Sequence, residues 1–295
     1  MASLRSDVPH GRDDLGGLLA APACAAIRPA LRAVLHDAIE AGDIGTLRDP
    51  PEVLADTLSA LATLDAEGDV LASAILHSAP ALRERLQPRL EREFPAVAML
   101  LEGQRAAAQV WALHAERQAS GSNEGLRRLL LAIVRDLRVI PVLLARQLAR
   151  MRHASRLPTE ERRALAQLTR DIHAPLANRL GIWQLKWELE DLAFRYLEPD
   201  TYQRIARLLD DKRSGRERYI EQVKQTLLAA LAAQGVRADV AGRPKHIFSI
   251  WKKMQKKNVP IGELYDLRAV RVLVDDIPAC YAALGTVHAL WQPVP

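Results

Sequence analysis

The fold and the function of this chain depend on one basic stretch, GRPKHIFSIWKKMQKKN, which runs from Gly242 to Asn258. Between Arg243 and Lys257 it holds six lysines and arginines and no acidic residue. Winding residues 245–257 as a helix at about 100° per residue separates two faces. The apolar face is made of Ile247, Ile250, Trp251 and Met254. The opposite, polar face is made of Lys245, Ser249, Lys252, Lys253 and Lys256.

The polar face suits a polyphosphate. Pro244 fits the first turn of such a helix, where its missing N–H costs nothing, and the N–H groups of a helix start favour anions. A strand is predicted next, over 266–274, and its only carboxylate, Asp266, could share Mg²⁺ with phosphates. A basic amphipathic helix is also typical of a solvated surface, which composition alone favours, and lysines can bind nucleic acid. The residues alone leave these three interpretations open.

The same stretch resembles a known family. Residues 242–254, followed by DLRAVR at 266–271, are similar to the start of the synthetase domain of RelA/SpoT enzymes. That family transfers pyrophosphate from ATP to the 3′-hydroxyl of GTP or GDP, which makes the alarmones of the stringent response. The resemblance implies these substrates, Mg²⁺ as cofactor, and a set of site residues. Arg243 would contact ATP, a set of three residues would hold its phosphates, and Asp266 would bind the metal. The three phosphate-binding residues would be Lys245, Ser249 and Lys253.

Length and composition set the frame for this resemblance. The 295 residues exceed one ordinary core and suit two domains. Apolar residues make up 49% and aromatic residues only 4%, and the abundance of Ala and Leu predicts a mainly helical protein. The net charge of +5 favours anionic partners without identifying one.

Cysteine usage and the absence of targeting patterns predict a cytoplasmic protein. Cys24 and Cys280 lie far apart without a metal-ligand spacing, which is typical of reduced thiols. No run reaches the roughly 18 apolar residues of a membrane span, and early acidic residues argue against a signal peptide. We therefore expect a soluble chain that does not contact a membrane.

Three segments are predicted along the chain. Residues 1–25 lack apolar periodicity and predict a flexible tail. Residues 26–198 predict a helical HD-like domain, and residues 199–295 predict linker helices and then the first part of an α/β nucleotidyltransferase-like synthetase domain. Helices are predicted over about 27–42, 52–65, 68–79, from 126 onward, 159–176, 217–234, 245–257 and 277–290, strands over 236–240 and 266–274, and a loop over 118–124.

The helical domain resembles the family's hydrolase domain, but it lacks most of the metal ligands of the active hydrolases. Active hydrolases carry an early His, a His-Asp pair, a Glu-Asp pair and a later Asp. The early His would fall near Pro50, and the other matching positions hold His77-Ser78, Ala81-Leu82 and Arg146. A transition metal needs several imidazoles and carboxylates at once, and an arginine repels a cation. The resemblance therefore implies a pseudo-hydrolase without hydrolase activity, in which His77 is a leftover helix residue.

Several other histidines and aromatic residues are not assigned to a binding site. His36-Asp37 has the form of a metal-ligand pair, but nothing nearby supplies the further ligands that a site needs. Residues 171–192 resemble the family's junction after the hydrolase domain, and within them His173 is predicted to be a packing or surface residue. Three aromatic residues are predicted to fill a core rather than to stack on a base, namely Trp183, Trp187 and Phe194.

Two strings of the family are missing from the 295 residues. In the family a Gly-Tyr-x-Ser-x-His segment stacks the guanine, and a Glu-x-Gln-x-Arg-Thr segment supplies the carboxylate that activates the GTP hydroxyl; neither occurs here. Transfer needs phosphate clamps and a positioned nucleophile. We therefore expect a chain truncated within the synthetase domain and inactive alone, with ribosome or tRNA contacts only through regions it lacks. A regulatory module without catalysis and a nucleic-acid-binding module remain the alternatives.

Overall fold

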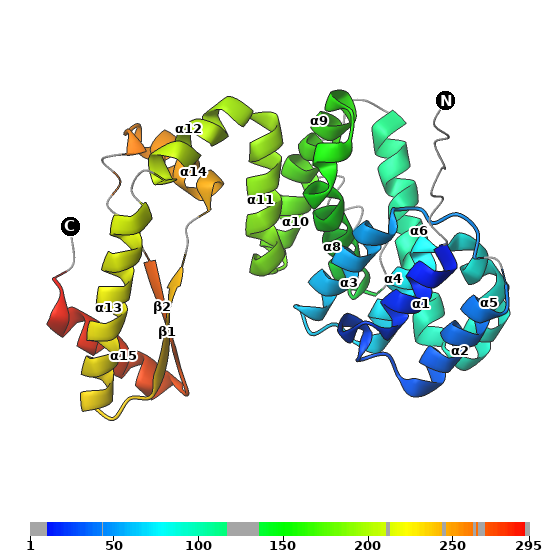
Figure 1. Cartoon of the computed structure of the whole chain (residues 1–295), viewed down its shortest axis with the longest axis horizontal. Helices are drawn as coiled ribbons and strands as arrows, with labels where there is room; N and C mark the ends of the chain where they lie inside the picture. Colours follow the sequence, from blue (N-terminus) through cyan, green and yellow to red (C-terminus); the bar gives the residue numbers. More distant parts are fainter. Residues whose placement is uncertain are drawn as a thin grey trace, which may run out of the picture. The chain divides into compact units, whose positions relative to one another are not determined.

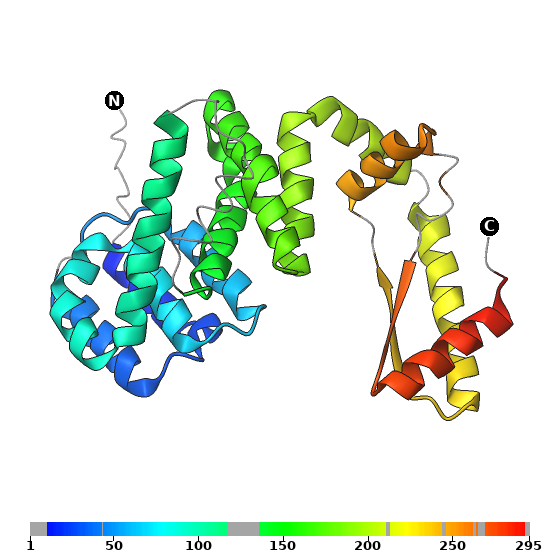
Figure 2. The ribbon, with the colours of Figure 1, turned by 180° about the vertical axis from the view of Figure 1, so that it is seen from behind.

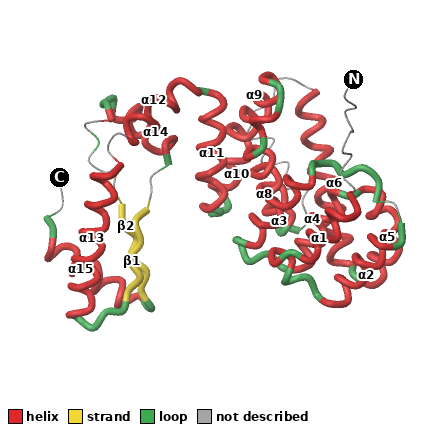
Figure 3. The backbone as a smooth tube through the Cα atoms, in the orientation of Figure 1, coloured by secondary structure: helices red, strands yellow, loops and turns green. Residues whose placement is uncertain are grey.

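The structure is a computed structural model that describes residues 11–42, 44–116, 136–210, 213–243, 246–261, 264 and 269–292. The described chain is mainly helical with one small sheet, as the sequence predicted, and Figure 3 colours these elements. It divides into two units, 1–193 and 194–295, close to the boundary expected at residue 198. The loop predicted over 118–124 and the start of the helix predicted from residue 126 lie outside the described residues.

The described part of the first unit is built from helices (Figure 1). They bury one continuous core of mostly leucine, alanine and isoleucine side chains. In chain order the elements are α1 Gly11–Ala20, η1 Pro22–Cys24, α2 Pro29–Glu40, α3 Pro51–Ala62, α4 Gly68–Ser78, α5 Pro80–Glu93, α6 Pro95–Glu116, α8 Val139–Arg152, η2 Ala154–Arg156, α9 Thr159–Leu168, η3 Thr169–His173, α10 Ala174–Arg179 and α11 Trp183–Leu197. Four of these helices, α2, α3, α5 and α6, begin at a proline, whose missing N–H is harmless in the first turn.

The N-terminal residues pack onto this core. A flexible tail was predicted over 1–25, but α1 and η1 cover most of 11–24, and Leu15, Leu19 and Cys24 are at most 2% exposed. The prediction was wrong here because Leu15 and Leu19 lie one helical turn apart and bury a face on their own, although Gly16 and Gly17 between them suggested a loop. Residues 1–10 lie outside the described residues.

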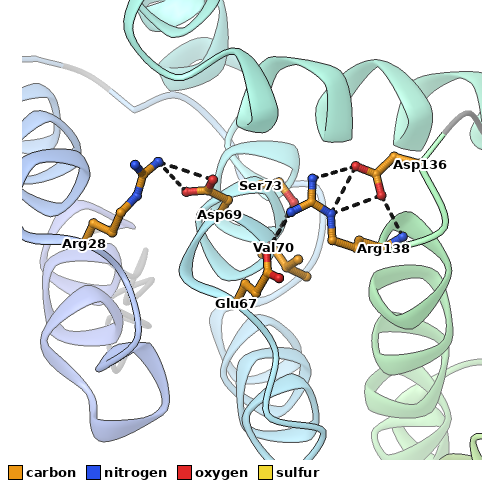
Figure 4. Close-up of polar contacts among 7 residues, drawn as sticks. All are labelled: Arg28, Glu67, Asp69, Val70, Ser73, Asp136 and Arg138. Atoms are coloured by element: carbon orange, nitrogen blue, oxygen red, sulfur yellow. Dashed lines mark hydrogen bonds and ion pairs between the residues drawn. The ribbon is translucent and has the colours of Figure 1, made fainter.

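Charged side chains tie the start of α4 to two other segments (Figure 4). Arg138, directly before α8, donates hydrogen bonds to both carboxylate oxygens of Asp136 and to Glu67 Oε2 at 2.6 Å. Arg28, at the start of α2, donates to Asp69 Oδ1 at 2.9 Å. The hydrogen bonds from Arg138 hold the pKa of Asp136 below its usual value. Bidentate arginine–carboxylate pairs fix geometry as well as charge, so they orient the starts of α2, α4 and α8.

The second unit folds around a two-stranded antiparallel sheet (Figure 2). Its elements after the end of α11 are α12 Pro199–Asp210, α13 Arg213–Ala233, β1 Ala238–Arg243, α14 Ile247–Lys257, β2 Ala269–Val274 and α15 Ile277–Leu290. The helices α13 and α15 lie on the same side of the sheet in both views. On that side Val270, Val272 and Val274 of β2 pack with Leu227 and Leu231 of α13, the alternation expected of a strand with one covered face.

The boundaries around the basic helix differ from the predicted ones. The strand predicted over 236–240 lies at Ala238–Arg243, because pairing with β2 continues to Arg243, opposite Ala269. The helix predicted from residue 245 begins at Ile247, after the extended residue His246, and ends at Lys257, before Asn258, which has a φ of 52°. Gly235, with a φ of 72°, follows the end of α13, as a glycine helix stop predicts. Within the described residues, no helix is both long and apolar enough to cross a membrane.

Candidate functional site

Helix α14 is amphipathic, as the sequence predicted. Ile250 is 1% exposed, and Ile247, Trp251 and Met254 pack around it. The partners of this face are Phe194 at the end of α11 and Ile205 of α12, and the rings of Phe194 and Trp251 lie 4.8 Å apart between centroids. The apolar face is therefore anchored in a core of the second unit, which fixes the direction of the opposite face.

The polar face of α14 brings together two of the predicted phosphate-binding residues. Ser249 and Lys253 lie one helical turn apart, so their side chains leave the helix on the same face. Both are partly buried, while Lys252, Lys256 and Lys257 are exposed. The hydroxyl and this ammonium therefore sit closer to the packed part of the unit than the other three lysines do.

The remaining predicted site residues cannot be placed. Lys245 and Asp266 lie outside the described residues, and Arg243 is described only as the last backbone position of β1. Next to it, a Cβ on Gly242 would lie 2.7 Å from Ile220 Cγ2, so this glycine lets β1 approach α13 closely. Among the described residues no group of three or more His, Cys, Asp or Glu side chains is arranged to hold a metal ion.

A second polar cluster lies in the first unit, around Arg146 and His77. Arg146 of α8 donates from Nε to Asp49 Oδ2, and its Nη1 lies 3.1 Å from His77 Nε2 of α4. Since a guanidinium can only donate, Nε2 of His77 accepts, and the ring carries its proton on Nδ1. The carboxylate of Asp49 is 7% exposed and the side chain of Arg146 is 25% exposed, so the pair is largely withdrawn from water.

Burial and a local excess of arginines keep this histidine neutral. Burial, followed by the charges of Arg146 and Arg48, lowers the pKa of His77 to about 3, against a raising effect of Asp49. Arg150, one turn after Arg146 on α8, has its Nε 3.6 Å from Asp49 Oδ1. Burial and Arg146 lower the pKa of Arg150, while Asp49 raises it. One carboxylate thus faces several guanidinium groups, the reverse of a cation site.

The second histidine of the cluster comes from the π-helical turn η3. His173 is buried, and its Nδ1 lies 3.3 Å from the carbonyl of Leu168; burial lowers its pKa to about 4. Gln147 of α8 donates to Thr169 Oγ1 at 2.7 Å and so fixes α8 against this turn. Such turns interrupt α-helices and are frequent at functional sites. His173 therefore packs between helices, as predicted, and also faces a cavity.

That cavity has a volume of about 210 Å³. Three apolar residues, Ala108, Leu143 and Leu168, form part of its wall. The polar lining is made of His77, Gln104, Arg146, Gln147, Arg150 and His173. Three of these residues, His77, Arg146 and His173, stood out separately in the sequence, whereas Asp49 and Arg150 did not. An arginine placed in a helical interior needs a nearby carboxylate, but nothing in the sequence shows that this carboxylate is 97 residues away.

Exposure bears on two other interpretations made from the sequence. His36 and Asp37 are 63% and 78% exposed and lie 3.8 Å from each other, without a metal-ligand cluster around them in the described chain. Phe194 fills a core as predicted, but Trp183 is 46% exposed. The prediction for Trp183 was wrong because it lies at the first residue of α11, where it lies 6.1 Å from Trp187 between centroids and 5.2 Å from the Lys186 ammonium.

Comparison with known proteins matches both units. Residues 33–183 match a family described as "HD domain", and residues 242–295 match one described as "Region found in RelA / SpoT proteins". The chain belongs to the RelA/SpoT family. This RelA/SpoT chain is 44% identical over 246 residues to the GTP pyrophosphokinase of Escherichia coli K12, which covers 80% of the chain and 32% of the relative.

Other relatives carry two kinds of name. The RelA/SpoT chain is 42% identical over 243 residues to the GTP pyrophosphokinase of Photobacterium angustum, with 80% of the chain and 32% of the relative covered. It is 46% identical over 173 residues to a probable guanosine-3′,5′-bis(diphosphate) 3′-pyrophosphohydrolase of Synechocystis, with 58% of the chain and 23% of the relative covered. The chain spans about a third of the length of the GTP pyrophosphokinases it matches.

Proposed function

We propose that the second unit supplies the ATP side of a pyrophosphate transfer from ATP to the 3′-hydroxyl of GTP or GDP. The observation that carries this proposal is the polar face of α14, on which Ser249 and Lys253 lie one turn apart while Ile250 anchors the opposite face. A hydroxyl and an ammonium spaced in this way can hold neighbouring phosphates of one polyphosphate chain. The names of the relatives, GTP pyrophosphokinase, agree with that chemistry.

Three further residues, whose side chains the structure does not describe, complete the proposed site. Arg243 would contact ATP, Lys245 would bind a phosphate, and Asp266 would provide an oxygen ligand for Mg²⁺, which usually shares its coordination sphere with substrate phosphates. Mg²⁺ would neutralise charge on the phosphates as the pyrophosphoryl group leaves. Because the 295 residues lack the family's guanine-stacking and nucleophile-orienting strings, we expect them to bind ATP without completing the transfer alone. The cytoplasmic location inferred from the sequence stays a prediction.

The test compares two lysines of the same helix. ATP binding to the purified chain is measured by calorimetry with Mg²⁺, for the parent, Lys253→Ala and Lys257→Ala. The two variants lose the same charge, but Lys257 is the exposed last residue of α14 and lies two helical turns from Ser249. We expect Lys253→Ala to weaken binding about tenfold or more, since a charge-assisted hydrogen bond contributes about 1.5–3 kcal/mol, and Lys257→Ala to bind like the parent. Equal loss in both variants would instead indicate nonspecific attraction to a basic surface.

The metal and the alternatives are tested in the same experiment. Asp266→Asn should remove the Mg²⁺ dependence of ATP binding and leave the circular dichroism spectrum unchanged, because an amide is a much poorer magnesium ligand than a carboxylate. Failure of the parent to bind ATP would favour a regulatory module without catalysis. Binding that falls steeply with salt and shows no preference for a triphosphate would favour nucleic acid.

We also propose that the first unit does not hydrolyse the alarmone. The ion pair between Arg146 and Asp49 occupies the cluster around His77, and a fixed guanidinium there opposes binding of a metal cation. Incubation with guanosine 3′,5′-bis(diphosphate) and Mn²⁺ should release no pyrophosphate. Metal-dependent release that His77→Ala abolishes would contradict this proposal.

A further inference from the structure

The cavity of about 210 Å³ in the first unit has an unusual charge balance. Two guanidinium groups, those of Arg146 and Arg150, line it, and among the described residues the one carboxylate in contact with both is Asp49. The two histidines of the wall add no compensating negative charge, because both are buried and neutral at physiological pH. The wall therefore keeps a net positive charge in a place partly withdrawn from water.

Two further arginines that are not part of the cavity lining, Arg48 and Arg83, add positive charge near His77. Burial and then the charges of Arg83 and Arg146 lower the pKa of Arg48. The same two charges and that of Arg48 act on His77. Positive charges that disfavour one another in this way are stabilised by an anion placed among them, since the interaction is stronger in a medium of lower dielectric than in water.

The guanidinium groups of Arg146 and Arg150 also have N–H donors that make no hydrogen bond to the described residues. Arg146 uses Nε for Asp49 and Nη1 for His77, and its Nη2 has no hydrogen-bond partner in the described part of the chain. The guanidinium of Arg150 makes no hydrogen bond to any described residue, and its contact with Asp49 is an ion pair at 3.6 Å. Each guanidinium has five N–H donors in a planar fork that matches the oxygens of a phosphate group.

We propose that this cavity is a binding site for a small oxyanion of the phosphate class, held by Arg146 and Arg150. A site of this size is smaller than the roughly 300–1,000 Å³ of pockets that enclose drug-sized ligands, so it fits a phosphate group and not a whole nucleotide. The ligand is therefore free inorganic phosphate or the phosphate group of a small monoester. This inference concerns the first unit and does not depend on ATP binding by the second.

The experiment measures hydrogen–deuterium exchange of the full chain at fixed ionic strength, with chloride, inorganic phosphate or glycerol 3-phosphate as the anion. The monoester has no base, so it does not mimic ATP beyond its phosphate. We expect saturable protection of peptides from α8 and η3, the elements that carry Arg150 and His173. If inorganic phosphate binds more tightly, the site takes the free anion; if glycerol 3-phosphate binds more tightly, it takes an ester. Either result supports the proposal.

A charge-matched pair of variants localises the effect. Arg150→Gln should weaken the protection about tenfold or more in apparent affinity, the change expected for losing a charge-assisted hydrogen bond. Arg163→Gln, on an exposed position of α9 away from the cavity wall, should bind like the parent. Unchanged circular dichroism would show that both variants are folded. Absence of saturable protection, equal protection by chloride, or an unchanged affinity in Arg150→Gln would overturn the proposal.

Discussion

The ion pair between Asp49 and Arg146 is the feature of the first unit whose removal has the most predictable cost. It joins the residues just before α3 to α8, and it lies beside His77 of α4. Arg146→Gln leaves the Asp49 carboxylate, which is 7% exposed, without its hydrogen-bonded partner. Breaking a buried pair by removing one partner costs about 3–5 kcal/mol. We expect about 3 kcal/mol, the lower end, because Arg150 remains 3.6 Å away and Arg146 is itself a quarter exposed.

The partner variant and the double variant turn this cost into a measurement of the pair. Asp49→Asn leaves Arg146 and Arg150 facing each other without a carboxylate, so it should destabilise by a similar amount. In the double variant no charge is left unpaired at this position, so its cost should be smaller than the sum of the single costs. Groups in direct contact typically show coupling of about 0.5–3 kcal/mol, and we expect the upper half of that range.

Urea unfolding followed by far-ultraviolet circular dichroism gives the free energies, and hydrogen exchange of α3, α4 and α8 shows whether the loss is local to these helices. A second readout is the pKa of His77, which should rise in Arg146→Gln because Arg146 is one of the charges that lower it. Single costs below 0.5 kcal/mol with additive behaviour in the double variant, as for independent surface positions (about 0.5 kcal/mol), would refute the reasoning.

Two further predictions concern stability. The free energy of unfolding should fall as pH drops below the unfolded histidine pKa of 6.5 toward the folded values of about 3 for His77 and about 4 for His173. In this range the unfolded state binds more protons than the folded state, and the slope is about 1.4 kcal/mol per pH unit for each histidine. A His77→Gln variant that kept the full slope in urea titrations would contradict this. Gly68→Ala should destabilise by about 1–3 kcal/mol, since its Cβ would lie 2.2 Å from the carbonyl oxygen of Ala26, whereas Gly17→Ala, with no atom within 4 Å, should be neutral or stabilising in thermal melts.

The parts of the fold that were predictable are those with a local signal. The period of Ile247, Ile250, Trp251 and Met254 predicted both the helix and its buried face, because one turn repeats every 3.6 residues whatever lies around it. The bounds of β1 were not predictable in this way. Its last residues are in a strand because β2 pairs with them, and pairing between segments separated by a helix leaves no trace in the local sequence.

The two candidate sites also differ in how much of each a local sequence signal could predict. The order of residues in the basic stretch was enough to name Ser249 and Lys253, which share a helix face. The cluster around His77 depends on Asp49, which meets Arg146 only through the packing of α3 against α8. The resemblance predicted that Arg146 stands at a metal-ligand position of the family's hydrolases. It could not predict which carboxylate neutralises Arg146, because that choice is made by tertiary contacts.

The guanidinium of Arg146 has one property that a bound ion lacks: it cannot dissociate. A metal stabilises a fold only to the extent that its free concentration exceeds its dissociation constant, and a chelator can remove it. An arginine is protonated at every physiological pH and is supplied with the chain at synthesis. The interhelical junction at Asp49 and His77 is therefore permanently charged, so its strength is insensitive to metal starvation, the condition under which a metalloprotein of the same architecture would loosen.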